Sequence, residues 1–221
     1  MLPRLACVDA RRINNSLAIR LLQSGYKATG HAARAPQTNL MNLYFLRHAS
    51  AGTRRPNPVV DVRRPLDKEG KQQCMLLGSY LNSLKVQFDL VVSSPLKRAQ
   101  QTASFVGTEV GYESEILITE ALSPGATLRQ FEDFLMRLEE PEEGQPELEN
   151  VLVVGHNPNL AAFLGAMCST GKTSLRMRKG ALARVDLTRR PGTLHWLVDP
   201  RILRGVYGKV TKRSRRKTSR K

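Results

Sequence analysis

The sequence predicts an α/β fold, a three-layer α/β/α sandwich in which helices cover both faces of a mostly parallel sheet. Two observations predict it. Short apolar runs of strand length alternate with longer segments whose apolar residues recur at helical spacing, as in folds built from alternating strands and helices. The run 151–154, Val-Leu-Val-Val, is apolar throughout, which is typical of a parallel strand covered on both faces.

The first half of the pattern opens at Met41 with a strand over 43–46. Asp67 is placed to cap a helix, whose apolar positions follow helical spacing at Leu76, Leu77, Tyr80, Leu81 and Leu84. A short buried strand follows at 90–92. Ser94 and Pro95 then have the pattern of an N-cap and a first helical residue, which predicts a helix to about residue 106.

The second half continues the alternation. A helix fits 128–138, and the acidic Pro/Gly-rich stretch 139–146 is typical of a surface loop. After the strand at 151–154, Asn157 and Pro158 repeat the cap-and-proline pattern before another helix, with apolar positions at Leu160, Phe163, Leu164 and Met167. Two late strands are predicted at 181–187 and 194–198, joined by a turn over 189–192.

The charge of the chain is concentrated at its ends. The 221 residues carry a formal net charge of +16, but residues 41–200 hold 19 basic and 18 acidic side chains. We therefore expect one folded domain over 41–203, between an N-terminal extension at 1–40 and a basic disordered tail at 204–221. The tail lacks interleaved aromatic residues, so it predicts at most weak, sequence-independent contact with polyanions.

Residues 1–40 are rich in arginine and poor in acids, which is compatible with a transit peptide for organelle import. A disordered extension or a start codon assigned too early fits as well, and we favour these two because Met41 directly opens the first strand. Three cysteines without a CxxC pair favour a reducing compartment. We expect a cytoplasmic protein without a membrane span, and the oligomeric state stays open.

Three strand candidates end on residues suited to bind phosphate. Arg47-His48 follows the first, Ser93-Ser-Pro-Leu-Lys-Arg98 the second, and Gly155-His156-Asn-Pro158 the third. Because the carboxyl ends of parallel strands form the binding edge of an open α/β sheet, these residues are expected to converge. Ser94 and Asn157, at the predicted starts of two helices, would add contacts to a bound anion there.

The residue types indicate phosphoryl transfer. A neutral imidazole is a competent nucleophile near pH 7, and we assign this role to His48. Arg47 and Arg98 offer planar, permanently charged groups that match phosphate oxygens. His156 is expected to donate to the same oxygens, protonated once the anion is bound. We interpret Arg54, Arg55, Arg63 and Arg64 as a solvated loop face, with a minor role in widening the cationic field.

Taken together, Arg-His, Ser-Ser-Pro-x-x-Arg-Ala-x-Gln-Thr-Ala and Gly-His-Asn-Pro resemble the histidine phosphatase superfamily, over about 41–203. The resemblance implies a phosphoglycerate mutase-like fold and a phosphohistidine intermediate, without metal or cofactor. Arg47-His48-Ala49 and the ending Trp196-Leu-Val-Asp-Pro200 look most like the SixA-type phosphohistidine phosphatases, which implies a substrate that is phosphohistidine on a partner protein.

The general acid and the substrate stay open. Many relatives use a carboxylate before the last catalytic histidine, a position that Glu120 matches; Asp61 is a substitute, and phosphohistidine hydrolysis needs an acid less because imidazole leaves readily. A small phosphomonoester or nucleotide-derived metabolite is the alternative substrate. A mutase is disfavoured because it requires a closed, water-free pocket. The alternative of another class is a polyanion-binding module that uses the basic tail.

The sequence excludes the chemistry of the cysteine-dependent phosphatases. No cysteine is followed six positions later by arginine, so the loop of cysteine-dependent phosphatases is absent. The sequence also contains no P-loop lysine motif and no Asp/His metal-binding pattern.

Overall fold

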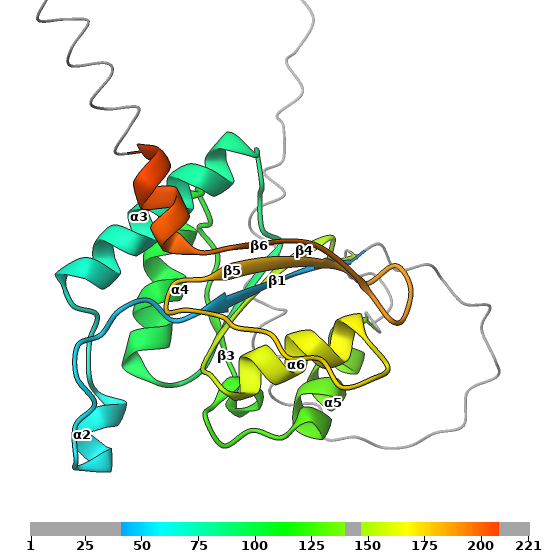
Figure 1. Ribbon diagram of the computed structural model, residues 1–221, viewed down its shortest axis with the longest axis horizontal. Coiled ribbons are helices and arrows are strands. Elements are labelled where there is room, and N and C mark those ends of the chain that lie inside the picture. Colours follow the sequence, from blue (N-terminus) through cyan, green and yellow to red (C-terminus); the bar gives the residue numbers. More distant parts are fainter. Residues whose placement is uncertain (1–40, 140–146, 208–221) are drawn as a thin grey trace, which may run out of the picture.

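The chain folds around one mixed sheet (Figure 1), and the computed structural model describes residues 41–139 and 147–207. Within these residues the sheet has six strands in the spatial order β3-β2-β4-β1-β5-β6. Their bounds are β1 Asn42–Arg47, β2 Leu90–Ser93, β3 Leu117–Ile118, β4 Asn150–Gly155, β5 Leu182–Asp186 and β6 Thr193–Val198. Strands β3, β2, β4 and β1 are parallel, and β5 runs antiparallel to both β1 and β6. The predicted mostly parallel sheet is confirmed.

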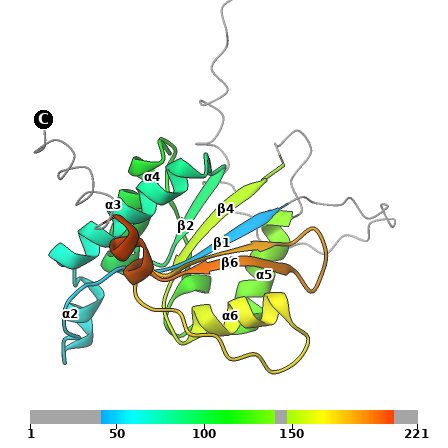
Figure 2. The ribbon, with the colours of Figure 1, turned by 45° about the horizontal axis from the view of Figure 1, so that its top comes forward.

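Alternate side chains of the central strands enter two separate apolar layers. Leu43 and Phe45 of β1 belong to one cluster, whereas Tyr44 and Leu46 belong to the other. The first cluster is closed by helices α5, Leu128–Glu139, and α6, Asn159–Cys168; the second is closed by α3, Lys68–Ser83, and α4, Lys97–Glu109. Figure 2 shows these helix pairs on opposite sides of the sheet. The structure confirms the three-layer α/β/α sandwich.

The helix starts differ in how closely they follow the prediction. Asp67 is the N-cap of α3, and its carboxylate accepts the backbone N–H of Gly70 at 2.7 Å, as predicted. Helix α4 has Leu96 as its N-cap, so it begins later than the predicted Ser94–Pro95 start. Helix α6 likewise begins after Pro158 and not at Asn157. Ser94 and Asn157 are released from capping and bond elsewhere, as described below.

Several short elements were absent from the prediction. They are helix α2, Pro58–Val62, strand β3, and the 3₁₀ helix η2, Glu120–Leu122. A further helix over 200–207 corrects the predicted start of the basic tail at residue 204, since 204–207 continue the helix and Leu203 is buried. The predictions for 1–40, for most of the acidic loop 139–146 and for 208–221 lie outside the described residues. Within the described ranges, no helix is long and apolar enough to cross a bilayer.

Candidate active site

The sheet register brings the three predicted strand ends together. β4 lies between β2 and β1, and Arg47 of β1 is the register partner of Gly155 in β4. The His48 N–H donates to the Gly155 carbonyl at 3.0 Å, and the Ser94 N–H donates to the Val154 carbonyl at 3.0 Å. His48, Ser94 and His156 therefore leave the sheet side by side, because each directly follows the last residue of a paired strand.

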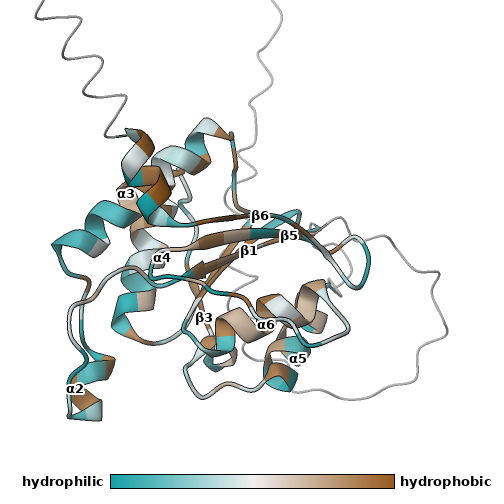
Figure 3. Cartoon of the chain, viewed as in Figure 1, coloured by the Kyte–Doolittle hydropathy of each residue, from teal (hydrophilic) through white to brown (hydrophobic). Residues whose placement is uncertain are grey.

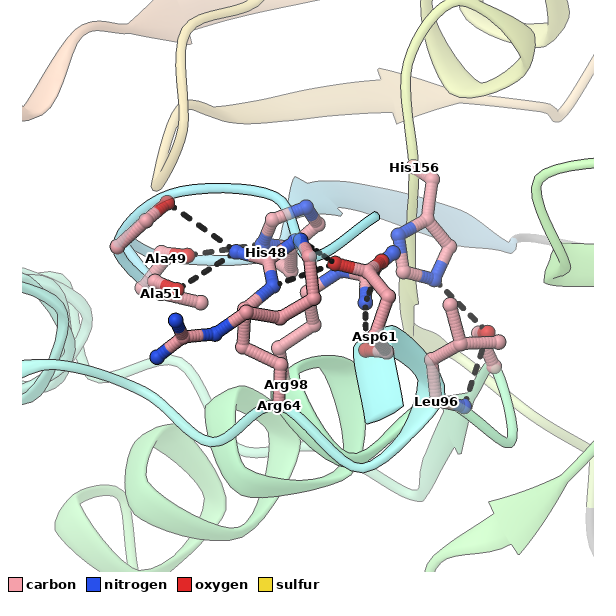
Figure 4. A network of polar contacts seen from close by, with 11 residues as sticks. His48, Ala49, Ala51, Asp61, Arg64, Leu96, Arg98 and His156 are labelled. Carbon is pink, nitrogen blue, oxygen red and sulfur yellow. Dashed lines mark hydrogen bonds and ion pairs between the residues drawn. The ribbon is translucent and has the colours of Figure 1, made fainter. Parts of the chain in front are cut away.

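Two buried histidines lie at the centre of this edge (Figure 4). The rings of His48 and His156 are 4.9 Å apart between centroids, and the residues are only 6% and 3% exposed. His48 Nδ1 lies 2.8 Å from the carbonyl oxygen of Ala49. Because a carbonyl only accepts hydrogen bonds, Nδ1 carries the proton and Nε2 keeps its lone pair. His48 is thus held in the tautomer of a nucleophile.

His156 is fixed from the other side. Its Nε2 lies 2.9 Å from the hydroxyl oxygen of Ser94, which accepts the Leu96 N–H at 3.4 Å. The Ser94 hydroxyl is then free to donate to Nε2, which leaves the proton of a neutral His156 on Nδ1. This Nδ1 is buried and has no hydrogen-bond partner among the described residues. Buried polar atoms are normally paired, so Nδ1 is suited to donate to a bound ligand.

Both imidazoles are held neutral by their surroundings. Burial lowers the pKa of His48 well below its ordinary value, and the electrostatic coupling to the neighbouring His156, where a second positive charge would be repelled, lowers it further. Burial is also the main cause that lowers the pKa of His156, to about 3, followed by the positive charges of Arg98 and Arg47. The prediction that His156 is protonated with an anion bound concerns the occupied site; without one, both rings are uncharged.

Two arginines border the histidine pair. Arg98 lies in the first turn of α4, and its Nη1 donates to the Asp61 carbonyl at 3.0 Å and to Asp61 Oδ2 at 3.3 Å. Arg47, the last residue of β1, donates to the Met177 carbonyl at 2.8 Å. The Nε atoms of both arginines are buried without a partner in the described part of the chain. Each guanidinium is anchored by one nitrogen and has donor capacity left for an anion.

An ion-pair network joins α2 to this site, and sequence reasoning missed it. Arg64 Nε donates to Asp61 Oδ1 at 2.8 Å, and Arg64 Nη1 donates to the Ala51 carbonyl at 2.6 Å. The Arg64 side chain is mostly buried, so its assignment to a solvated loop face was wrong. The Asp-x-x-Arg spacing is a signal for this pair. Nothing in the sequence indicates that Asp61 also contacts Arg98.

The candidate acids and the remaining predicted residues differ in placement. Hydrogen bonding to the Arg55 N–H, together with Arg64 and Arg98, lowers the pKa of Asp61 to about 2, so it is ionised at neutral pH and is a poor proton donor. Glu120 is exposed in η2, and its carboxylate accepts a hydrogen bond from the Ser123 hydroxyl.

Asn157, a predicted substrate contact, is anchored by its amide nitrogen. Its Nδ2 donates to the Met177 carbonyl at 2.9 Å, which leaves its buried Oδ1 unpaired among the described residues.

The loop after β1 is braced by α3. The Asp67 carboxylate accepts the Ser50 hydroxyl and the Gly52 N–H, both at 2.7 Å, while Gln73 Oε1 accepts the Ser50 N–H at 2.9 Å. Gly70 is required at this contact, since a Cβ there would lie 1.9 Å from the Ser50 carbonyl oxygen. The backbone around His48 is therefore held from both sides, which preorganises the nucleophile.

Comparisons with known proteins agree with this geometry. The model of the histidine phosphatase superfamily (branch 1) matches residues 43–123. An uncharacterized protein of Picosynechococcus is 32% identical over 145 residues, which cover 64% of this chain and 82% of that protein. The phosphohistidine phosphatase SixA of Escherichia coli K12 is 29% identical over 161 residues, 72% of this chain and 94% of that enzyme.

A solved structure gives the same likeness in three dimensions. The protein histidine phosphatase SixA complexed with tungstate superposes with a TM-score of 0.65 at 28% identity. The superposition covers 74% of this chain and 99% of that protein. The similarity therefore extends over nearly the whole length of that relative.

Proposed function

Because the chain belongs to the histidine phosphatase superfamily and is a phosphatase, we propose that it hydrolyses phosphohistidine on a partner protein, through a phosphohistidine intermediate on its own His48. The observation that carries this proposal is the buried pair of neutral imidazoles, 4.9 Å apart, bordered by arginines with unpaired donors. The similarity to a phosphohistidine phosphatase over 94% of that enzyme's length supports the substrate class.

The bound state of a relative supports the same use of the site. Tungstate is a tetrahedral oxyanion like phosphate, and it is the ligand named for the superposed SixA structure. In this chain, Arg47 Nε, Arg98 Nε and His156 Nδ1 are buried donors without partners in the described residues. A phosphoryl group among them would satisfy these donors and neutralise the cationic field.

The chemistry takes two steps. His48 Nε2 attacks phosphorus, the bond from phosphorus to the substrate imidazole breaks, and that imidazole leaves with the electron pair. Water then attacks phosphorus on His48, which releases inorganic phosphate and returns the lone pair to Nε2. Arg47, Arg98 and His156 bind the oxygens on which charge develops. Ser94 holds His156 in its donor tautomer, and Asn157 lies next to it in the chain.

A dedicated acid is less needed for this leaving group than for an alkoxide. Asp61 remains ionised and holds Arg98, which makes it an anchor for the arginine and not a proton donor. Glu120 remains the candidate general acid for a poorer leaving group, such as an alkoxide. The phosphomonoester alternative would depend on that acid much more strongly, so Glu120→Gln separates the two substrate classes.

A substrate panel tests the proposal. Purified full-length protein is assayed against a phosphohistidine peptide, free phosphohistidine, and aryl and alkyl phosphomonoesters. We expect kcat/KM to be highest for the phosphohistidine peptide and nearly unchanged there by Glu120→Gln. Faster turnover of an alkyl phosphomonoester, with a loss of about 100-fold in Glu120→Gln, would overturn the substrate assignment.

A further inference from the structure

Helix α2 exposes an apolar surface beside the active site. Val59, Val60 and Val62 are 65%, 49% and 46% exposed, and none of the five residues of α2 is buried. Isolated exposed valines are ordinary, but three within one short helix form a patch. In Figures 1 and 2 this helix projects from the body of the domain, and Figure 3 shows its mixture of hydrophobic and hydrophilic residues.

The same helix reaches into the active site through the side chain of Asp61. Asp61 points inward and contacts Arg98 and Arg64, so the exposed valines lie within two residues of a direct partner of Arg98. Helix α2 is therefore tied through Asp61 to an arginine that borders the histidine pair. A macromolecule that inserts a phosphorylated side chain here would lie against α2.

The charge around the patch specifies the partner. Residues 51–66 contain four arginines and a single acid, Asp61, which is already paired. Arg55 and Arg63 are exposed, and within the described residues neither forms an ion pair. The surface is thus apolar and cationic, which complements a face that is apolar and acidic.

The chain's own flanking segments do not complement it. Residues 1–40 hold six basic side chains and one acidic, and residues 209–221 hold only basic ones among their charged residues. Like charges disfavour either segment on this surface. The acidic stretch 139–149 of a second copy has the correct sign, with six glutamates, and it is the competing occupant that an experiment must separate.

We propose that Val59, Val60, Val62, Arg55 and Arg63 form a docking surface, here called the α2 platform, for an acidic, amphipathic face of the phosphorylated partner protein. The proposal rests on the proposed function for the nature of the phosphoryl group, and it adds how a protein substrate is distinguished from a small one. Docking contacts outside the reacting centre lower KM for the protein substrate and leave small substrates unaffected.

Synthetic peptides of equal length test the platform. One carries a single phosphohistidine flanked by Glu and Leu, a second carries it flanked by Lys and Ser, and free phosphohistidine is the small substrate. The variants are Arg55→Gln/Arg63→Gln and Val59→Gln/Val60→Gln/Val62→Gln, since glutamine preserves helix propensity. Matched controls are Arg129→Gln/Arg137→Gln on α5 and Ile202→Gln/Val206→Gln on the helix 200–207, which are similarly exposed.

We expect the wild type to prefer the acidic peptide by about tenfold in kcat/KM, as a few exposed charge pairs and apolar contacts provide. Each platform variant should lose most of this preference through KM, while hydrolysis of free phosphohistidine and the thermal midpoint stay unchanged. The arginine effect should also shrink at high salt. The control variants should keep the wild-type preference.

Three outcomes overturn the proposal. They are an unchanged peptide preference in both platform variants, an equal loss for free phosphohistidine, or a wild-type dimer that dissociates in the platform variants while the peptide preference persists. The last result would assign the surface to a second copy. If the wild type cleaves no phosphohistidine, the proposed function fails. Docking on the α2 platform is then still measured, as the binding of the same peptides with phosphoserine in place of phosphohistidine.

Discussion

The active site has two halves that are held by different forces. The first half consists of Arg47, the last residue of β1, and of three residues that directly follow strands, His48, Ser94 and His156. The sheet register and the packed layers around the sheet position all four. Asp61 and Arg64 come from the segment between β1 and α3, where α2 has no buried residue and is joined to the site by hydrogen bonds and ion pairs.

This difference separates the reacting groups from the groups that adjust them. A strand end within a close-packed core is displaced only at high energetic cost, which suits a nucleophile and its donors. The α2 segment contributes no buried residue of its own and is held by hydrogen bonds and two ion pairs, so it is displaced at lower cost. Arg98 belongs to both halves, because α4 carries its backbone and Asp61 binds its guanidinium. We therefore expect large effects on activity from the first half and smaller ones from the second.

The largest expected effect is at Arg98. Arg98→Lys keeps the charge but loses the planar fork that can bind Asp61 and a phosphoryl group together, so kcat/KM for phosphohistidine peptide should fall about 100-fold. The exposed neighbour Lys97 provides the matched control, and Lys97→Arg should retain wild-type activity. An Arg98→Lys enzyme within a factor of three of the wild type would show that the strand-borne half does not depend on this fork.

A smaller effect is expected at Asp61. Asp61→Asn removes the ion pairs with Arg98 and Arg64 and leaves the cationic field stronger, so kcat should fall about tenfold while KM does not rise. Steady-state kinetics on phosphohistidine peptide measures this split, with the exposed Asp133→Asn on α5 as the control. A rise in KM at constant kcat would instead indicate that Asp61 touches the substrate.

The sequence predicted the residues at the strand ends better than it predicted the segment that contains α2. Five of the six strands, the two helix pairs and the meeting of His48 with His156 followed from apolar runs and from the geometry of parallel sheets, whereas the two-residue strand β3 did not. The position of Arg64 and the Asp61–Arg98 contact did not, because a polar loop without an apolar pattern carries no signal for its path. The helix over 200–207 was missed for a related reason, since its basic composition hid one buried leucine.

The last expected effect concerns stability in acid and not activity. The folded-state pKa values of His48 and His156 lie below the ordinary value of 6.5, so the unfolded chain binds more protons as pH falls below that value. Stability should therefore be full above pH 6.5 and decline below it by up to about 1.4 kcal/mol per pH unit for each histidine. Urea unfolding from pH 7 to pH 4 should show a shallower decline in His156→Gln.

The contribution of the Asp61 ion pairs to stability should persist to lower pH than that of the two histidines. The lowered pKa of Asp61, about 2, keeps its contribution intact above the unfolded-state value near 3.8, and it is lost only as pH falls toward 2. Between pH 7 and pH 4, Asp61→Asn should thus shift the curve of stability against pH without changing its slope.

For the histidines, parallel curves of stability against pH in the wild type and in His156→Gln would contradict the neutral, buried state of the pair.

Phosphorus should pass through His48 during turnover, and trapping of the phosphoenzyme detects this passage. Full-length protein is mixed with ³²P-labelled phosphohistidine peptide, quenched during turnover, and digested for peptide mapping under alkaline conditions that preserve phosphohistidine. We expect label on His48 in the wild type, its persistence in His156→Gln, and its absence in His48→Ala. Turnover without label on the protein, or label mapped to another residue, would contradict it.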